Sequence, residues 1–312
     1  MDTATVARFE ASRNRLASLA YRLQGSAADA QGTVEGAVLR WQAADPEYVE
    51  VPEAWLTKIV TNLALDRLRS AKVRRERAVG AWMPEPLLDG DPMLGPADTV
   101  EQGESVTLAV LTLMERLSPV ERAVYVLREA FSYSHAEIAE ILDITESASQ
   151  QHAHRARRRI TAERNSRDID RASARRIVEA FVDAASSGRT ERLVALLTDD
   201  ATGISDGAAG LAETLIRYST PQRLADAVRA GFRPSPAKRR LAGGSPSIHA
   251  AVVNGCPAML FALDGRVLGV AILEIRDDKI AAVRGIAAPH RLGRLAEEWQ
   301  RQEHDVPLIE SW

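Results

Sequence analysis

The segment from residue 134 to residue 159, whose sequence is SHAEIAEILDITESASQQHAHRARRR, constrains the fold more than any other part of the chain. Ser134 and Glu137 are spaced as a capping box, which predicts the start of a helix at this point. Asp143, Ile144 and Thr145 then predict a short turn, in which Ile144 can fill the core between two helices. Two helices joined by so short a turn predict a helix-turn-helix within a small helical domain.

The second of these helices has two chemically different faces. Its predicted buried stripe carries small and apolar residues, which are Ser149, Ala153, Ala156 and Ile160. Its opposite face carries hydroxyl, amide, imidazole and guanidinium groups, which are Ser147, Gln150, Gln151, His154, Arg155 and Arg158. Such groups bind base edges and phosphates in the major groove, so this face is the predicted DNA-binding site. An ordinary pair of helices with a solvated charged face is the alternative.

Three histidines lie in or near this segment, namely His135, His152 and His154. Metal sites in proteins usually combine histidine with cysteine, or with carboxylates grouped around the ion. The segment has no cysteine, and its carboxylates are not arranged around these histidines. The sequence therefore predicts no metal site and no cofactor, and we expect the histidines to lie on the surface or to face phosphates.

The distribution of charge supports a nucleic-acid partner, although the net charge of the chain is −3. Residues 67–77 carry six basic groups and one acidic group, and residues 155–159 carry four basic groups. Residues 81–108, in contrast, carry six acids and neither lysine nor arginine. Because phosphate binding depends on the local density of lysine and arginine, two separate basic helices are candidates for DNA contact.

The N-terminal part of the chain has helical periodicity from about residue 5 to residue 77. A helix from Asp29 to Trp41 is predicted, with Asp29 as its cap, and Pro52 is placed to open a further helix over residues 53–72. Residues 80–104 are rich in proline, glycine and acid and show no sustained period, which is typical of a linker. We therefore expect a helical domain over residues 1–80, a linker over 81–108 and a second helical domain over 109–165.

The C-terminal part has a different pattern. Helices are predicted at about residues 171–187, 190–197 and 210–230, and short β-like runs follow at 248–254, 258–263, 267–275 and 279–287. Helices followed by strands with tight turns predict an α+β domain with a curved antiparallel sheet. We place this domain at residues 171–296, followed by a C-terminal tail at 297–312.

Whole-chain features exclude several classes of protein. The sequence has no run of eighteen apolar residues, and its N-terminus lacks the apolar core of a secretion signal. The single cysteine, Cys256, cannot form an internal disulfide, which agrees with a reducing compartment. We therefore expect a cytoplasmic protein without a membrane partner, in which Cys256 is a buried, inert thiol.

Two motifs resemble those of the extracytoplasmic-function sigma factors of RNA polymerase. The first comprises Tyr21-Arg22-Leu23, Asp29-Ala30, Leu39-Arg40-Trp41 and the pattern from Trp55 to Arg69. The second comprises Leu117-Ser118-Pro119-x-Glu121-Arg122, the helix-turn-helix and residues 154–158. The resemblance implies a multidomain fold with two all-α helical domains, sigma region 2 and sigma region 4, at residues 1–80 and 109–165.

The resemblance also implies partners and sites. The partners are core RNA polymerase, through its β′ clamp helices, and promoter DNA. The implied polymerase-binding residues are Asp29, Glu35, Leu39 and Arg40. The implied contacts to the −10 element are Lys58, Asn62, Asp66, Arg69, Lys72 and Arg74, and the predicted recognition helix would bind the −35 element. Gln31, Gly32 and Gly36 stand where the family usually has further acids, which weakens the match to a basic clamp surface, and the two glycines cost helix stability.

The C-terminal domain resembles the cone-shaped SnoaL-like fold of the NTF2 superfamily, which a subgroup of these sigma factors carries. In that subgroup the extra domain is thought to control activity by contacting the sigma domains and the linker. The implied interdomain residues are Trp82, Pro84 and Glu85 of the linker motif and Asp206 and Gly207 of a loop motif that lacks its usual lysine. Asp206, His249 and His290 are the candidates for proton transfer, although we favour structural or solvent-facing roles and predict no catalytic residue.

Three functions remain open. The favoured one is an alternative sigma factor, monomeric when free, whose own C-terminal domain modulates it. The second is a helix-turn-helix regulator that senses a small molecule with its C-terminal domain, and the third is an enzyme of the cyclase or isomerase kind with a helical appendage. The Trp55 to Arg69 motif favours the first, since neither alternative requires it. A small ligand in the C-terminal domain is left open.

Overall fold

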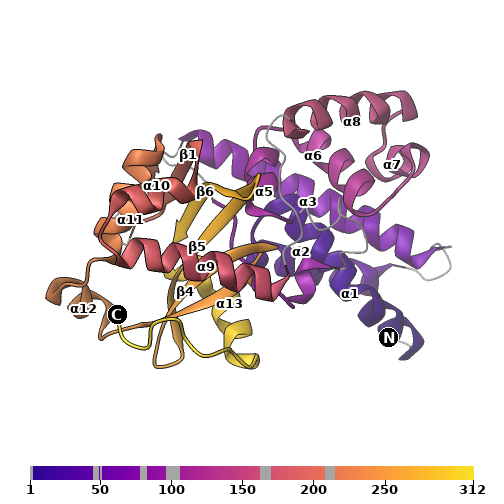
Figure 1. Ribbon diagram of the computed structural model, residues 1–312. Coiled ribbons are helices and arrows are strands. Elements are labelled where there is room, and N and C mark those ends of the chain that lie inside the picture. The colour runs from indigo at the N-terminus through magenta and orange to yellow at the C-terminus, as the bar shows by residue number, and fades with distance from the viewer. Residues whose placement is uncertain are drawn as a thin grey trace. The chain divides into compact units, whose positions relative to one another are not determined.

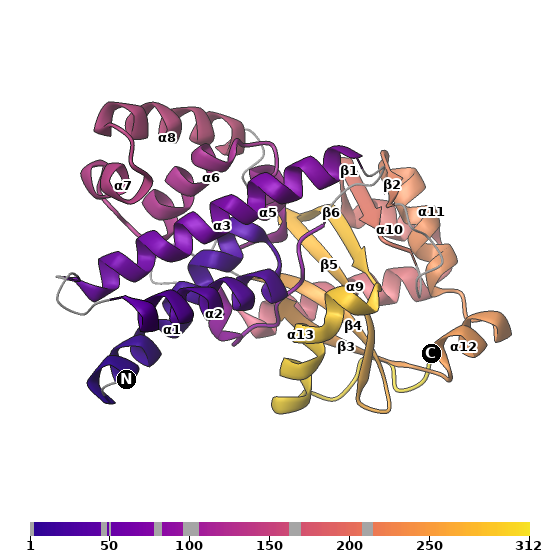
Figure 2. The same ribbon diagram turned by 180° about the vertical axis from the view of Figure 1, so that it is seen from behind.

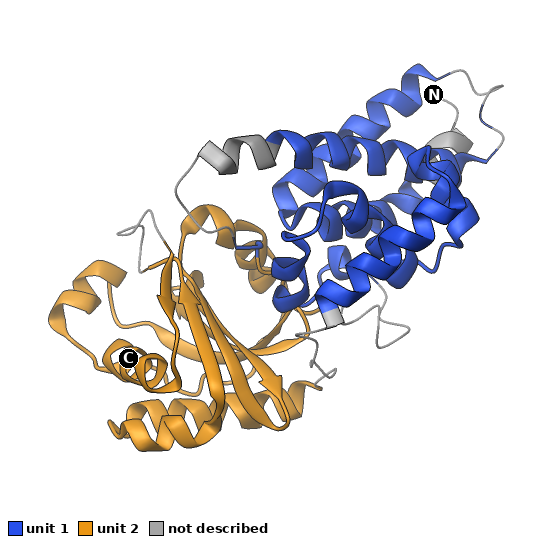
Figure 3. Ribbon diagram, turned by 90° about the horizontal axis from the view of Figure 1, so that it is seen from above, with its two compact units in different colours: residues 1–85, 90–164 blue, residues 86–89, 165–312 orange. Residues whose placement is uncertain are grey.

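The computed structural model describes residues 3–44, 49, 51–77, 83–95, 106–161, 170–207 and 215–312. Figure 1 shows its helices and strands along the chain. The chain divides into two compact units, which Figure 3 colours separately. Unit 1 comprises residues 1–85 and 90–164, and unit 2 comprises residues 86–89 and 165–312. The four residues 86–89 of the linker therefore belong to unit 2.

The first part of unit 1 is a group of three packed helices, α1 (Thr3–Gln24), α2 (Ala27–Ala43) and α3 (Pro52–Arg77). Their apolar stripes meet in a core that includes Leu19, Val34 and Leu56. Pro52 opens α3 as predicted. The predicted cap of α2 is wrong, because Ser26 is the N-cap and its hydroxyl accepts a hydrogen bond from the backbone N–H of Asp29. Ser26 precedes the helix, whereas Asp29 already lies in its first turn.

The second part of unit 1 contains the predicted helix-turn-helix. It consists of α5 (Leu108–Met114), α6 (Pro119–Tyr125), a π-helical turn η3 (Val126–Ala130), α7 (His135–Leu142) and α8 (Glu146–Thr161). The capping box of Ser134 and Glu137 opens α7 as predicted. Asp143 ends α7 in the left-handed conformation (φ 53°), which aspartate tolerates better than most residues. The Thr145 hydroxyl then caps α8.

The core of unit 2 is formed by a six-stranded sheet in the order β2-β1-β6-β5-β4-β3. The strands are β1 (Leu197–Ser205), β2 (Ile216–Tyr218), β3 (Ser247–Val253), β4 (Cys256–Leu263), β5 (Arg266–Arg276) and β6 (Lys279–Ile286). The last four lie within two residues of the predicted runs. The expectation of an antiparallel sheet is wrong in one respect, because β1 and β6 are parallel. The sheet is therefore mixed.

Helices cover both faces of this sheet, as Figures 1 and 2 show from opposite sides. On one face α9 (Arg171–Ser186), α10 (Thr190–Leu196) and α11 (Pro221–Phe232) enclose a core that includes Phe181, Met259 and Leu273. On the other face α13 (Pro289–Arg301) packs on β5. The short helix α12 (Pro236–Ala242) has no buried residue, and its Lys238 donates to carbonyl oxygens at the end of α11. The predicted helix over residues 210–230 is wrong at its start, because strand β2 precedes α11 and Pro221 lies at its first turn.

The free edge of β3 is covered by two segments from distant parts of the chain. Near its end, Asp89 donates its backbone N–H to Val252 at 2.9 Å, and Asn254 donates its own to Leu87 at 2.9 Å. Near its beginning, Ile248 exchanges backbone hydrogen bonds with residues 308 and 309 of the tail. Residues 87–89 of the predicted linker therefore add to a sheet edge. The predicted end of the C-terminal domain at residue 296 falls inside a helix, because α13 continues to Arg301.

Three further findings concern membrane-spanning helices, the cysteine and metal-binding groups. None of the described helices is long and apolar enough to cross a membrane. Cys256 is 2% exposed, as expected for a thiol packed in a core. Among the described residues no group of histidine, cysteine, aspartate and glutamate is arranged to hold a metal ion.

Candidate nucleic-acid and polymerase interface

The recognition helix α8 separates its two faces as the sequence predicts. The stripe of Ser149, Ala153, Ala156 and Ile160 is buried, with at most 2% exposure, and packs against the neighbouring helices. All six residues predicted for the opposite face are exposed. They are Ser147, Gln150, Gln151, His154, Arg155 and Arg158. Four of these, Ser147, Gln151, His154 and Arg158, follow one another at steps of four, three and four residues, so they form one row along the helix.

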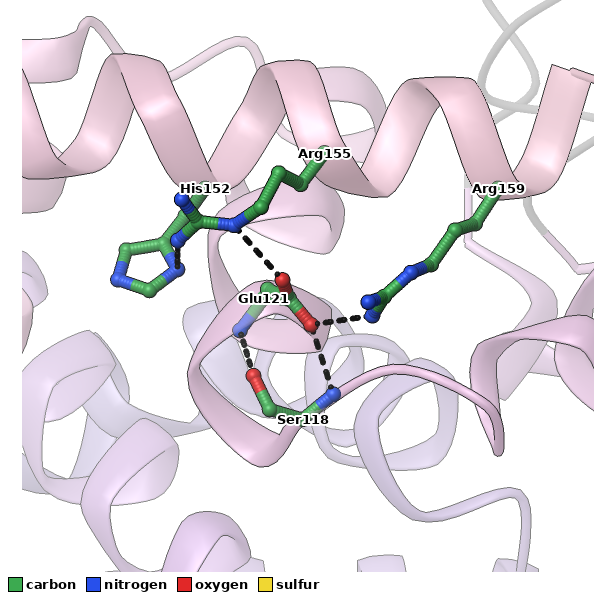
Figure 4. A network of polar contacts seen from close by, with 5 residues as sticks. All are labelled: Ser118, Glu121, His152, Arg155 and Arg159. Carbon is green, nitrogen blue, oxygen red and sulfur yellow. Dashed lines mark hydrogen bonds and ion pairs between the residues drawn. The ribbon is translucent and has the colours of Figure 1, made fainter.

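One predicted DNA contact, Arg155, is engaged within the domain. Figure 4 shows its guanidinium turned toward Glu121 of α6, with Nε 3.0 Å from Oε1. Arg159 binds the other oxygen of the same carboxylate at 2.9 Å, and the backbone N–H of Ser118 donates to that oxygen at 3.0 Å. Arg155 also contacts the ring of His152 at 2.8 Å. The Glu121 carboxylate therefore links the start of α6 to the middle and the end of α8.

The environment of Glu121 keeps its carboxylate ionised. The residue is 5% exposed, and burial alone would raise its pKa. The hydrogen bonds from Ser118 and Arg155 and the charge of Arg159 act in the opposite direction and leave the pKa below its usual range. For His152, burial and the charge of Arg155 lower the pKa. The network thus holds one buried anion between two cations.

A second carboxylate binds another arginine of α8. Glu129, in the π-helical turn, accepts hydrogen bonds from Nε and Nη2 of Arg157 at 2.9 and 2.6 Å. Arg158 is the remaining arginine of the helix, and within the described part of the chain it has neither an ion pair nor a hydrogen bond. As far as the chain is described, the exposed row of α8 therefore presents one unpaired guanidinium.

The predicted −10 contacts lie on α3 but have different surroundings. The Nζ atom of Lys58 lies 2.7 Å from a carboxylate oxygen of Asp143, in the turn of the helix-turn-helix, and 2.9 Å from the carbonyl oxygen of Glu140. Asp66 and Arg69 pair with each other at 3.0 Å on the exposed surface, and Asn62 is half-buried. The side chains of the other two predicted contacts, Lys72 and Arg74, lie outside the described residues.

The predicted polymerase-binding residues share the outer surface of α2. They are all exposed, and they are Asp29, Glu35, Leu39 and Arg40. Leu39 is 67% exposed, which is unusual for a large apolar side chain in a folded domain. A surface of exposed leucine flanked by charges is suited to binding another protein.

The linker motif has a role within unit 1 that the sequence did not reveal. The carboxylate of Glu85 accepts hydrogen bonds from the hydroxyl of Ser26 and from the backbone N–H of Ala27, both at 2.8 Å. The Glu85 backbone binds Gly25 at 2.9 Å and the Tyr21 hydroxyl at 2.8 Å. Glu85 therefore caps the N-terminus of α2 from a distant part of the chain. In the same motif Pro84 is buried, and Trp82 lies outside the described residues.

The two parts of unit 1 contact each other through a polar and aromatic cluster. Arg15 donates to the hydroxyl of Tyr133 at 2.6 Å, and that hydroxyl lies 3.2 Å from the hydroxyl of Thr57. The guanidinium of Arg22, 2% exposed, lies over the ring of Phe131 at 5.5 Å, and burial lowers its pKa to about 10. Helices α1 and α3 are thus joined to the loop that precedes α7.

The candidate proton-transfer residues of unit 2 do not form a pair. Both carboxylate oxygens of Asp206 accept backbone N–H groups at the start of α13, from Ala287 at 2.7 Å and Ala288 at 3.2 Å. His249 instead contacts the ring of Trp299 at 5.1 Å between centroids, and His290 is exposed. Asp206 therefore fixes the two residues that precede α13, and it is followed by Gly207 in the left-handed region (φ 81°).

Comparison with known proteins agrees with these features. The family model of Sigma-70 region 2 matches residues 8–74, and that of Sigma-70, region 4 matches residues 107–160. The ECF RNA polymerase sigma factor SigJ of Mycobacterium tuberculosis is 37% identical over 297 residues, which cover 92% of this chain and 92% of the relative. The chain belongs to the extracytoplasmic-function sigma factors.

Other relatives of this sigma factor have the same extent. The probable ECF RNA polymerase sigma factor SigI of Mycobacterium tuberculosis is 31% identical, over 94% of this chain and 96% of the relative. The crystal structure of Mycobacterium tuberculosis SigJ superimposes with a TM-score of 0.68 at 29% identity, covering 93% of this chain and 98% of that one. The similarity thus includes the helix and mixed-sheet domain of unit 2 as well as the two sigma regions.

Family membership establishes the general function of the sigma factor, which is to direct RNA polymerase to promoters, and this family is not an enzyme family. The favoured prediction from the sequence is confirmed at this level. Sequence reasoning did not identify Glu121 and Glu129 as partners of α8, or Arg15 and Tyr133 as contacts between the two regions. The capping-box spacing of Ser118 and Glu121 was the one local signal that could have drawn attention to this acid.

Proposed function

We propose that this sigma factor contacts the −35 element with the exposed row of α8 and the −10 element with α3. The observation that carries the proposal is the alignment of Ser147, Gln151, His154 and Arg158 on the solvent side of a helix-turn-helix. Amide side chains bind adenine and arginine binds guanine in the major groove, so this row has the chemistry needed to distinguish base pairs. On α3, Asn62 and the basic run over residues 67–77 suit single-stranded DNA.

The outer surface of α2 is proposed as the docking surface for core polymerase. Exposed Leu39 offers apolar contact area, and Asp29 and Glu35 offer charges that complement a basic clamp helix of the β′ subunit. Two glycines, Gly32 and Gly36, lower the intrinsic stability of this helix. The cap supplied by Glu85 compensates at its N-terminus.

Promoter binding requires that unit 1 opens. The two elements are centred about 25 base pairs apart, or roughly 85 Å at 3.4 Å per base pair. In the described arrangement Lys58 of α3 lies 2.7 Å from Asp143 beside α8, so one molecule in this form cannot bind both elements at once. We infer that it represents the resting form and that polymerase separates the two regions.

Unit 2 is proposed to modulate this activity. Residues 86–89 pair with the edge of β3, while the preceding residue, Glu85, caps α2. Any rearrangement of the β3 edge therefore acts on a segment covalently joined to Glu85, the residue that caps the docking helix. We further propose that the free protein is a cytoplasmic monomer without catalytic activity, cofactor or membrane partner. A cavity of about 140 Å³ beside β3, lined by residues that include Arg171, Trp299 and His304, leaves room for a small ligand.

Run-off transcription with core polymerase and the full chain tests the proposal. We expect transcripts from a limited set of promoters, and loss of most activity in Arg158→Ala and in Asn62→Ala. Glu140→Gln, an exposed change on α7, is the control that should retain activity. If the protein binds duplex DNA without polymerase and never associates with it, the proposal is wrong and the alternative, a conventional helix-turn-helix regulator, is favoured.

A further inference from the structure

Three of the four arginines near the end of α8 are held by carboxylates of the same domain. Glu121 binds Arg155 and Arg159, and Glu129 binds Arg157. We propose that these two carboxylates are positioning residues that withhold three guanidinium groups from the DNA backbone, so that α8 distinguishes promoter from other DNA. The inference rests on the proposed −35 role of α8 and extends it to the control of specificity.

Burial of the carboxylates makes the restraint effective. Glu121 is 5% exposed and the side chain of Glu129 is 12% exposed, whereas the three arginine side chains are 46–53% exposed. A guanidinium that moved to a phosphate would leave a buried carboxylate without its partner, which is strongly unfavourable. The capping box with Ser118 also fixes the Glu121 carboxylate at the start of α6. The arginines are thus attached to a rigid anchor, although their outer atoms reach solvent.

The consequence concerns how the helix divides its contacts between phosphates and bases. Phosphate contacts by lysine and arginine supply affinity for any sequence, whereas contacts to base edges supply specificity. With the pairs intact, the exposed row has a hydroxyl, an amide, an imidazole and the guanidinium of Arg158, which has no ion pair with any residue that the structure describes. The restraint therefore lowers binding to random duplex more than binding to the correct element. It acts on specificity without requiring that Glu121 touch DNA.

Salt dependence measures the number of phosphate contacts directly. The logarithm of the binding constant falls with the logarithm of salt concentration with a slope of about −0.9 per phosphate contact. Glu121→Gln keeps the shape and one hydrogen-bonding oxygen of the side chain but removes the charge that holds two arginines. We expect the slope of Glu121→Gln to be steeper than that of wild type by up to about 1.8. Between 50 and 200 mM salt the variant should therefore lose about twelvefold more affinity than the wild-type protein loses.

The experiment uses holoenzyme formed from core polymerase and the full chain. Its equilibrium binding to a promoter duplex, and to the same duplex with a scrambled −35 element, is measured by fluorescence anisotropy across a KCl series. At low salt Glu121→Gln should bind the scrambled duplex several-fold more tightly and lower the preference for the promoter. Glu129→Gln, which removes the carboxylate charge that pairs with Arg157, should steepen the slope by up to about 0.9. Glu140→Gln changes the net charge equally but frees no arginine, so its slope should equal that of wild type.

A second variant keeps the inference testable if Glu121→Gln fails to fold. Arg159→Gln removes one of the restrained guanidinium groups, so its slope should equal that of wild type because this group does not reach phosphate. A slope shallower by about 0.9 in Arg159→Gln would overturn the inference, since it would mean that the arginine already binds DNA. An unchanged slope in a folded Glu121→Gln would also overturn it and leave the carboxylate a purely structural role.

Failure of the inference is distinguishable from failure of the proposed −35 role. If scrambling the −35 element and Arg158→Ala both leave wild-type binding unchanged, α8 does not bind that element and both proposals are wrong. If these two changes weaken binding while Glu121→Gln leaves the slope unchanged, only the restraint is wrong.

Discussion

Replacing Glu85 by alanine is expected to loosen the N-terminus of α2, although residue 85 lies far from that helix in the sequence. The substitution removes the two hydrogen bonds from Ser26 and Ala27 to the carboxylate, both 2.8 Å long. It leaves the backbone contacts of residue 85 to Gly25 and Tyr21 in place. The expected effect is therefore confined to the cap rather than spread over the linker.

The magnitude follows from the two contacts. Loss of a helix N-cap costs about 0.5–2 kcal/mol, and a hydrogen bond to a charged group contributes about 1.5–3 kcal/mol when it is well shielded from water. Because Glu85 is partly exposed, we expect a local loss of about 1–2 kcal/mol, which corresponds to roughly 5- to 30-fold more frequent opening. Glu85→Gln retains one acceptor oxygen and should lose about half as much.

Native-state hydrogen exchange of the full chain measures this opening. Protection of the amides in the first two turns of α2 should fall by the stated factor, while that of α8 should not change. Glu10→Ala is the matched control, because Glu10 is an exposed acid on α1 whose side chain pairs with Arg13. A change of less than twofold in α2 for Glu85→Ala would refute the assignment of Glu85 as its cap.

Three further predictions concern stability. Gly36→Ala should raise the free energy of unfolding by about 0.5–1 kcal/mol, because its methyl group would meet only Leu63, at 3.5 Å, whereas Gly95→Ala (φ 71°) should lower it; urea denaturation tests both. Burial lowers the pKa of His249, so the unfolded chain binds protons more readily and unit 2 should become less stable as pH falls below about 6.5. The protection factors of its amides, which correct for the intrinsic pH dependence of exchange, should be lower at pH 5.5 than at pH 7.5 in wild type. The difference should be smaller in His249→Asn, and an equal difference in both proteins would contradict this. A double-mutant cycle of Lys58→Gln and Asp143→Asn should give a coupling free energy of unfolding below about 1 kcal/mol, since both side chains of this ion pair are exposed. A value above about 2 kcal/mol would contradict a weak ion pair between α3 and the turn.

The sequence predicts those elements whose signals are local. The capping box of α7, the buried stripe of α8 and the strands β3 to β6 depend on spacings within a few residues, and the structure agrees with each. Strand β1 was missed because it has polar residues at most positions and is stabilised by parallel pairing with β6, about 80 residues later in the chain. The start of α11 was misplaced because a helical pattern was extended across a short strand that only tertiary pairing stabilises.

The functional residues divide in the same way. The chemistry of the exposed row on α8 follows from periodicity alone, so Gln151 and His154 could be assigned to the solvent side from the sequence. The pairing of Arg155 with Glu121 and the capping of α2 by Glu85 join residues 34 and 58–59 positions apart, and no local pattern encodes such contacts. Long-range ion pairs therefore decide which of the predicted basic residues are free to bind DNA.

Site-directed cleavage of promoter DNA tests the central claim that α3 and α8 act on two separate elements. An iron chelate is attached to a single cysteine in a chain that also carries Cys256→Ser. The cysteine is introduced either as Ser70→Cys on α3 or as Glu146→Cys at the start of α8, both exposed positions, and the full chain is bound to core polymerase on the promoter. We expect two cleavage sites about 25 base pairs apart, neither of which forms without polymerase. Cleavage at one common position, or equal cleavage in the absence of polymerase, would contradict it.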